Sequence, residues 1–140
     1  MADAVKKLGE AEVEIMQVIW DSDSPVTSNF ILKQLQDSRK WQLSTLMTSL
    51  ARLADKGFVA CDRSTGSNLY TALIPENQYK TGASRQFLEK LYHNSLRNMV
   101  AALYDDKALK ESDVAQLRDF LDQLEAEQND ANEQIREGNE

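Results

Sequence analysis

Residue types that commonly build specialised sites are scarce in this chain. Its 140 residues include one cysteine, one histidine and two prolines. The single cysteine, Cys61, excludes an intrachain disulfide, and it cannot supply the several thiolates that a Cu(I) or Zn(II) sensor site requires. We interpret Cys61 as a small buried strand residue, and we expect neither a bound metal nor a cofactor.

Long apolar runs are missing as well. No stretch approaches the roughly 20 apolar residues needed to cross a bilayer, and acidic side chains appear too early in residues 1–20 for a secretory leader. We therefore expect a cytoplasmic protein with no membrane partner. The five glycines are scattered, and the lone His93 has no plausible nucleophile nearby in the sequence. These absences predict that the chain is not an enzyme and has no catalytic residues.

The formal net charge of −7 is concentrated at one end of the chain. Residues 119–140 contain eight acidic side chains and a single base, Arg136, so residues 1–118 sum to zero. Within residues 33–63, six bases face three acids. A phosphate backbone responds to local charge, because charges more than about 8–10 Å apart are largely screened at physiological salt. The overall acidity is compatible with DNA binding, and it predicts modest affinity for non-specific DNA.

The first half of the chain has the pattern of three helices followed by a hairpin. Apolar side chains recur at helical spacing in three segments, which are bounded by turn-forming or capping residues. Two short strand-like segments follow, separated by a Ser-Thr-Gly-Ser turn. The predicted helices span residues 10–22, 28–38 and 43–56, and the predicted strands span 58–63 and 68–73. This order is that of a winged helix-turn-helix, which we place at residues 8–74.

The second half of the chain is predicted to form helices over residues 76–93, 96–105 and 111–128. Their apolar positions exceed what a winged helix needs to cover itself, which favours a shared dimer core over the cap of a monomeric one. The predicted dimer contacts are Phe87, Leu91, Met99, Val100, Leu103, Leu117, Leu121 and Leu124. We place a helical dimerisation domain at residues 75–128 and an acidic, disordered tail at 129–140. The predicted fold class is mainly α, with a small β-hairpin wing.

The segment 43–56 has two faces with different chemistry. One face is a stripe of leucines, which we expect to be buried. The other carries short hydroxyl side chains and one guanidinium, from Ser44, Thr45, Thr48, Ser49 and Arg52. Short polar side chains let a helix lie close in a major groove, where hydroxyls and arginine bind phosphates or base edges. A merely solvated helix face is the alternative interpretation.

The order and spacing of these segments resemble the BlaI/MecI/CopY family of penicillinase and copper-operon repressors. The resemblance covers nearly the full length, through LGEAEVEIMQVIW, VTSNFILKQL, WQLSTLMTSLARLADKGFV, LYTALIPENQY and NSLRNMVAALYDDKALKESDVAQLRDFLDQL. Its most specific part is the series Trp41, Thr45, Thr48, Arg52-Leu53 and Lys56-Gly57. The cysteine pairs of the copper-type members are absent from this sequence.

The resemblance implies a homodimer that binds double-stranded DNA at a palindromic operator, with one recognition helix in each major groove. The residues expected to contact DNA lie at the start of the second helix, along the third helix and in the wing: Thr27, Ser28, Gln42, Ser44, Thr45, Thr48, Ser49, Arg52, Lys56, Arg63 and Ser67. Two other functions stay open. An effector could bind a pocket at the dimer interface lined by Tyr79, Phe87, Tyr92 and Met99, or the winged helix could be a protein-interaction module.

Overall fold

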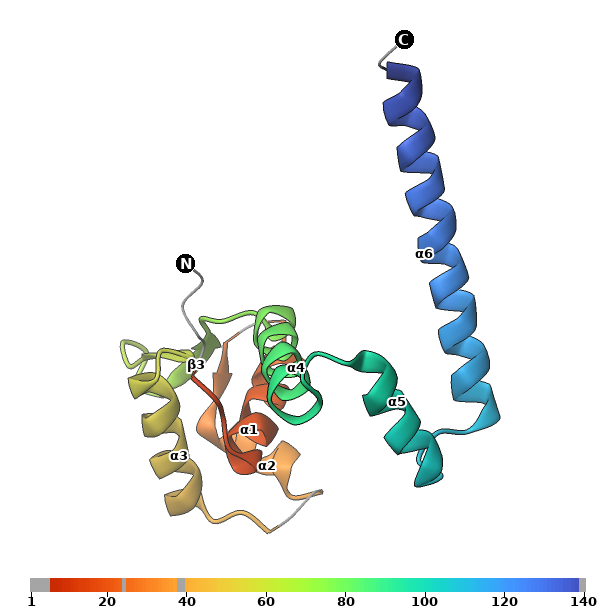
Figure 1. Ribbon diagram of the computed structural model, residues 1–140. Helices are drawn as coiled ribbons and strands as arrows, with labels where there is room; N and C mark the ends of the chain where they lie inside the picture. The colour runs from red at the N-terminus through yellow and green to blue at the C-terminus, as the bar shows by residue number, and fades with distance from the viewer. Residues whose placement is uncertain (1–5, 24, 38–39, 139–140) are drawn as a thin grey trace. The chain divides into compact units, whose positions relative to one another are not determined.

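The structure, a computed structural model, describes residues 6–23, 25–37 and 40–138 (Figure 1). Two compact units divide between Phe87 and Leu88. In chain order the elements are α1 (Glu10–Trp20), β1 (Val26–Thr27), α2 (Ser28–Leu35), α3 (Leu43–Asp55), β2 (Val59–Asp62), β3 (Leu69–Ala72), α4 (Glu76–Tyr92), α5 (Leu96–Asp105) and α6 (Glu111–Gly138). The predicted fold class, mainly α with a small β-hairpin wing, is confirmed.

The helices α1, α2 and α3 bury their apolar stripes against one another. Apolar residues three and four positions apart share one face of a helix, and here those faces turn inward. The buried side chains from the three helices are Ile15, Met16, Ile19, Ile31, Leu35, Leu46, Leu50 and Leu53. This packing fixes α3 by one face and leaves its opposite face exposed.

A three-stranded antiparallel sheet in the order β1-β3-β2 completes the first unit. β2 and β3 form the predicted hairpin, and Gly66 in the turn between them has a φ of +86°, a conformation that favours glycine. β1 was not predicted. Val26 pairs with Tyr70 and Thr27 with Leu69, but two residues are too few for an alternating pattern to reveal a strand.

The first half of α4 is part of the winged-helix unit, because Tyr79 is anchored there. Its side chain is 7% exposed, and its hydroxyl accepts a hydrogen bond from the Leu8 N–H at 3.0 Å. Its ring packs edge-on against Phe58, with 5.6 Å between ring centroids. The indole Nε1 of Trp20 adds a link to the segment before α4 by donating to the Ile74 carbonyl at 2.9 Å. The first compact unit consequently extends past residue 74, the predicted end of the winged helix.

The second unit contains the end of α4 together with α5 and α6. Within the described part of the chain, no side chain of α5 or α6 is buried. α5 begins at a capping residue, Ser95, whose hydroxyl accepts a hydrogen bond from the Asn98 N–H at 3.1 Å. A single copy of the chain therefore leaves the apolar side chains of these two helices in contact with solvent.

The C-terminal segment corrects one expectation. Disorder was predicted from residue 129, whereas α6 continues to Gly138; residues 139 and 140 lie outside the described part. Residues 129–137 contain neither glycine nor proline and include the helix-favouring Ala, Glu, Gln and Arg. Exposed helices and disordered segments share a polar composition, so composition alone did not separate the two.

Candidate nucleic-acid interface

α3 exposes a polar stripe opposite its buried leucines. Ser44, Thr45, Thr48 and Arg52 are all exposed, and we call these four residues the α3 polar stripe. The Thr48 hydroxyl donates to the Ser44 carbonyl at 3.0 Å, so its oxygen can still accept a hydrogen bond. The stripe offers hydroxyl and guanidinium groups, which bind phosphates and base edges. Its exposure agrees with the sequence-based expectation, and its contact with DNA stays a prediction.

The start and the end of α3 are both fixed by the residues around them. Trp41 is 7% exposed just before the helix, and its carbonyl accepts a hydrogen bond from Gln36 Nε2 at 3.1 Å. Gln42, a predicted DNA contact, is exposed at the N-cap position with extended backbone. After the last turn, Gly57 has a φ of +83°, which allows the chain to leave the helix sharply. The polar stripe is thereby held on a well-anchored helix.

Ser49 does not belong to this stripe, and its predicted place on the exposed face is wrong. It is only 9% exposed and lies on the inner face of α3. The helical spacing contains the signal, because position 49 is three residues after Leu46 and four before Leu53. Residue type had suggested the exposed face, but periodicity places Ser49 in the leucine stripe.

Lys56, a predicted DNA contact, is held within the first unit by an ion pair and its side chain is 28% exposed, so its contact with DNA stays a prediction. Its ammonium lies 2.7 Å from Glu12 Oε1 and 2.9 Å from Oε2, and the Glu12 side chain is 12% exposed. Burial by itself would raise the pKa of Glu12. The hydrogen bonds from Lys56 and the Gly9 N–H, with the charges of Lys56 and Arg52, outweigh burial and lower this pKa. Lys56 thus ties the end of α3 to α1, and no sequence pattern pointed to this pair.

The start of α2 and the turn of the wing line one polar hollow of about 280 Å³. Three predicted DNA contacts meet there: Thr27 and Ser28 from the α2 side, and Ser67 from the wing. The Thr27 hydroxyl accepts a hydrogen bond from the Phe30 N–H at 3.1 Å, which makes Thr27 the N-cap of α2. Sequence reasoning missed Asn29 and Asn68, which also line this hollow. They belong to segments that are distant in sequence, so only the folded hairpin brings them together.

The tip of the wing is ordered by its own side chains. Asp62 Oδ1 accepts hydrogen bonds from the Ser64 N–H at 2.9 Å and from its hydroxyl at 2.7 Å. These bonds hold the pKa of the Asp62 carboxyl below its usual value. Arg63, a predicted DNA contact, is exposed between them. A preformed tip presents Arg63 to a partner with less conformational entropy to lose on binding.

The predicted dimer residues are mostly exposed in the single chain. Phe87, Leu91, Leu103, Leu117, Leu121 and Leu124 are exposed, and Met99 and Val100 are half-buried. Of the residues expected to line an effector pocket at a dimer interface, Tyr79 lies instead in the core of the first unit; the pocket itself stays a hypothesis. The role of the eight predicted contact residues in dimerisation stays a prediction.

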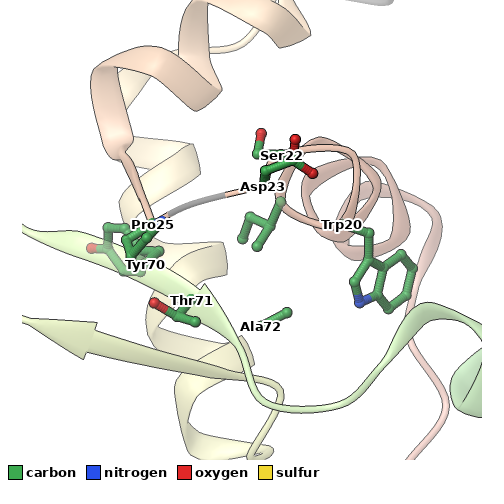
Figure 2. Close-up of a pocket in the computed structure, with 8 residues that line it drawn as sticks. Trp20, Ser22, Asp23, Pro25, Tyr70, Thr71 and Ala72 are labelled. Carbon is green, nitrogen blue, oxygen red and sulfur yellow. The ribbon is translucent and has the colours of Figure 1, made fainter.

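A second hollow, of about 230 Å³, lies between the turn after α1 and β3 (Figure 2). Trp20, Pro25 and Tyr70 contribute apolar surface to it, and Asp23 is the charged residue of its lining. No predicted DNA contact lines this hollow, and a carboxylate would repel a phosphate. It is therefore distinct from the candidate interface.

Within residues 6–23, 25–37 and 40–138, no three or more His, Cys, Asp or Glu side chains are grouped so that they could hold a metal ion. Within the same ranges, no helix combines the length and the apolar character needed to cross a membrane.

Comparison with known proteins identifies clear relatives. Residues 8–123 match the family model described as penicillinase repressor. A 16.5 kDa protein of Latilactobacillus sakei is 32% identical over 121 residues, covering 86% of this chain and 82% of that protein. The penicillinase repressor of Bacillus licheniformis is 29% identical over 119 residues, covering 85% and 92% respectively. The solved complex structure of hsRosR-S4 has a TM-score of 0.50 at 17% identity, over 75% of this chain and 93% of that one, a likeness of fold alone.

Proposed function

The chain belongs to the penicillinase repressor family, and we propose that it represses transcription as a homodimer whose two α3 helices enter the major grooves of a palindromic operator. Membership confirms the resemblance to the BlaI/MecI/CopY repressors. It also confirms that the chain is not an enzyme, because the family is one of repressors. The chain spans 92% of the Bacillus licheniformis penicillinase repressor, so the relationship covers nearly the whole of that protein.

The α3 polar stripe is the observation that carries this proposal. Its residues lie on a helix whose opposite face contains Leu46, Leu50 and Leu53, each no more than 1% exposed. A side chain can discriminate bases only if its helix stays in place while it binds. A major groove about 12 Å wide admits an α-helix, and the short side chains of serine and threonine permit close approach.

The hollow between α2 and the wing supports a phosphate contact beside the groove. Backbone N–H groups at a helix N-terminus favour anions, and Thr27 and Ser28 place such a terminus in the hollow. Ser67 adds a hydroxyl from the wing side. We propose that these groups position the chain on the DNA backbone, whereas Thr45, Thr48 and Arg52 select the bases.

The homodimer is supported by the second unit. Large apolar side chains such as Leu91 and Phe120 are 61% and 54% exposed in the single chain. Exposed patches of this kind on a small protein mark an interaction surface. Two identical copies give two-fold symmetry, and a two-fold symmetric reader requires a palindromic site with half-sites about one helical turn apart.

The test is selection of binding sites from a random pool of double-stranded DNA with the full chain, followed by fluorescence anisotropy on the selected sequence. We expect a palindrome. Arg52→Ala should weaken binding by about 1–3 kcal/mol, because a bidentate contact of arginine with guanine is worth that much. Thr48→Ala should have a smaller effect in the same direction.

Matched controls come from α4, where Arg85 and Thr81 are exposed residues of the same two types. Arg85→Ala and Thr81→Ala should leave the affinity unchanged. Normal binding by both α3 variants would contradict the assignment of the recognition helix. A selected sequence without two-fold symmetry would contradict the homodimer, and the failure of any sequence to emerge would contradict the repressor mechanism as a whole.

A further inference from the structure

α6 carries a mostly apolar seam, interrupted by Gln128 and Gly138, that continues beyond the predicted dimer contacts. Eight positions recur at alternating spacings of three and four residues: Val114, Leu117, Leu121, Leu124, Gln128, Ala131, Ile135 and Gly138. This average spacing of 3.5 is the repeat of a left-handed coiled coil. α6 is one helix of 28 residues over the whole stretch, so all eight positions lie along one side of it.

The end of this seam lies beyond the residues that match the family model. The match to the family model ends at residue 123, whereas α6 continues to Gly138. Leu124 is 38% exposed and Ile135 is 63% exposed. The described chain therefore leaves the seam uncovered along the segment 124–138, which we call the α6 extension.

We propose that the α6 extension pairs in parallel with the same segment of a second copy of this chain, as a two-stranded coiled coil along the seam. The inference rests on the homodimer proposed above and adds to it a second contact surface with a defined orientation. Continuity favours this occupant, because Leu117, Leu121 and Leu124 of the proposed dimer contacts lie on the same line as Gln128 and Ile135.

The charges that flank the seam favour the parallel orientation. In a parallel pair, the residue just before the first seam position of each heptad faces the residue five positions further along the other helix. Asp113 then faces Arg118 of the second copy, an attractive pair that occurs twice by symmetry. Asp113 Oδ2 already accepts a hydrogen bond from the Lys110 N–H at 2.9 Å, which leaves its other oxygen for the arginine. Glu125 and Glu127 face the uncharged residues Phe120 and Asn132.

An antiparallel pairing over the full seam is disfavoured by the same residues. Glu125 would face Glu125 of the second copy, and Glu127 would face Glu127, which places like charges opposite each other. Gln128 would face Leu124, so its amide would be buried against an apolar side chain. In the parallel pair Gln128 faces Gln128, and a polar residue that meets its own kind inside the seam fixes the register.

The acidity of α6 does not oppose this pairing. Asp119, Asp122, Asp130 and Glu133 lie at positions that point away from the seam, and all four are exposed. Charges on the outer faces of two paired helices are separated by the width of both helices and are screened by salt. These four acids therefore lie on the solvated outer surface of the pair.

The test is cysteine cross-linking of the full chain in a Cys61→Ser background, with diamide as the oxidant. In a parallel pair, Ile135→Cys places two thiols in one layer, at a separation that a disulfide can bridge. In an antiparallel pair the two residues 135 lie about 27 Å apart along the axis, at 1.5 Å per residue. Glu133→Cys, on the outer face, is the matched control. We expect Ile135→Cys to cross-link at least about tenfold faster than Glu133→Cys.

Sedimentation equilibrium of the unmodified chain separates the possible failures. If the chain is a dimer but Ile135→Cys cross-links no faster than Glu133→Cys, the extension is unpaired, and only this inference is overturned. If Ile135→Cys cross-links efficiently only with a Leu117→Cys chain, the pairing is antiparallel, and the proposed orientation is overturned. If the chain is a monomer, this inference and the proposed homodimer fail together.

Discussion

The two units of this chain treat their apolar side chains in opposite ways. Among the described residues, all 15 buried hydrophobic side chains lie in the first unit, from Leu8 to Tyr79. α5 and α6 bury no side chain, and their large apolar residues Leu96, Tyr104 and Phe120 are more than half exposed. The first unit therefore has a core within one copy of the chain. The second unit has many apolar side chains, but they do not form a buried core within the single chain.

This difference separates two sources of stability. A core inside one chain contributes the same free energy of unfolding at every protein concentration, whereas a core shared between chains contributes more as the concentration rises. The winged helix should then keep its fold when the dimer dissociates. The dependence of a variant's free energy of unfolding on protein concentration therefore tells whether the residue belongs to a core within one chain or to a core shared between chains.

The largest effect is expected from Leu53→Ala. Leu53 is fully buried in α3, and truncating a buried leucine costs about 2–5 kcal/mol through lost burial and the cavity left behind. The free energy of unfolding, from urea denaturation, should fall by this amount at two protein concentrations that differ about a hundredfold. Leu121→Ala in α6 should instead reduce the dependence of stability on concentration, because we propose that Leu121 contacts the second copy.

Leu73→Ala is the control for both variants, since Leu73 is 56% exposed outside the helices and strands. Its effect should stay within about 0.5 kcal/mol at either concentration. Equal destabilisation by Leu121→Ala at both protein concentrations would contradict the proposed difference between the two units. In that case α6 would be packed within one chain.

Local patterns made much of the first unit predictable. Leu46, Leu50 and Leu53 repeat at helical spacing. Gly57 marks the end of α3, and Gly66 marks the turn between β2 and β3. The features that were missed depend on contacts between distant parts of the chain. Lys56 meets Glu12 across 44 residues, and Tyr79 meets Leu8 across 71. A single sequence contains no periodic signal for such pairs.

The candidate site was predictable to the same extent. The exposed face of α3 follows from helical periodicity together with residue type, and applying the periodicity strictly would have removed Ser49. The hollow between α2 and the wing was not predictable as a site, because Thr27 and Ser67 come together only once the sheet forms. The α6 extension was missed because the predicted helix ended at residue 128, before the seam reached Ile135.

Tyr79→Phe tests where the first unit ends, with an intermediate effect. The substitution keeps the ring and removes the acceptor of the Leu8 N–H bond. Leaving a buried donor unsatisfied costs about 1–3 kcal/mol, so urea denaturation should show a loss of stability of that order. Tyr104→Phe, at a residue 62% exposed on α5, is the matched control and should change little. Equal effects of the two variants would contradict the anchoring of α4 on the winged helix.

The smallest effect is expected on stability at low pH. It would show that part of the pH dependence of stability comes from the first unit. The pKa of Glu12 is lowered from its ordinary value of 4.5 in the folded chain. The unfolded chain therefore takes up the proton first as the pH falls. The stability contributed by Glu12 is fully present above about pH 4.5, and it is lost as the pH falls through the folded pKa. Glu12→Gln should lower stability at pH 7 and flatten this loss in acid, measured by urea denaturation at both ends of the range.

Glu76→Gln provides the comparison, because hydrogen bonds from Lys80 and Gln17 lower the pKa of Glu76 in the same direction. Its side chain is 38% exposed, against 12% for Glu12, so solvent screens its ion pair more strongly. Glu76→Gln should therefore reduce the loss of stability in acid less than Glu12→Gln does. An acid profile of Glu12→Gln that matches the unaltered chain would show that the Lys56–Glu12 pair contributes nothing to stability, and the attachment of α3 to α1 would then rest on the apolar core alone.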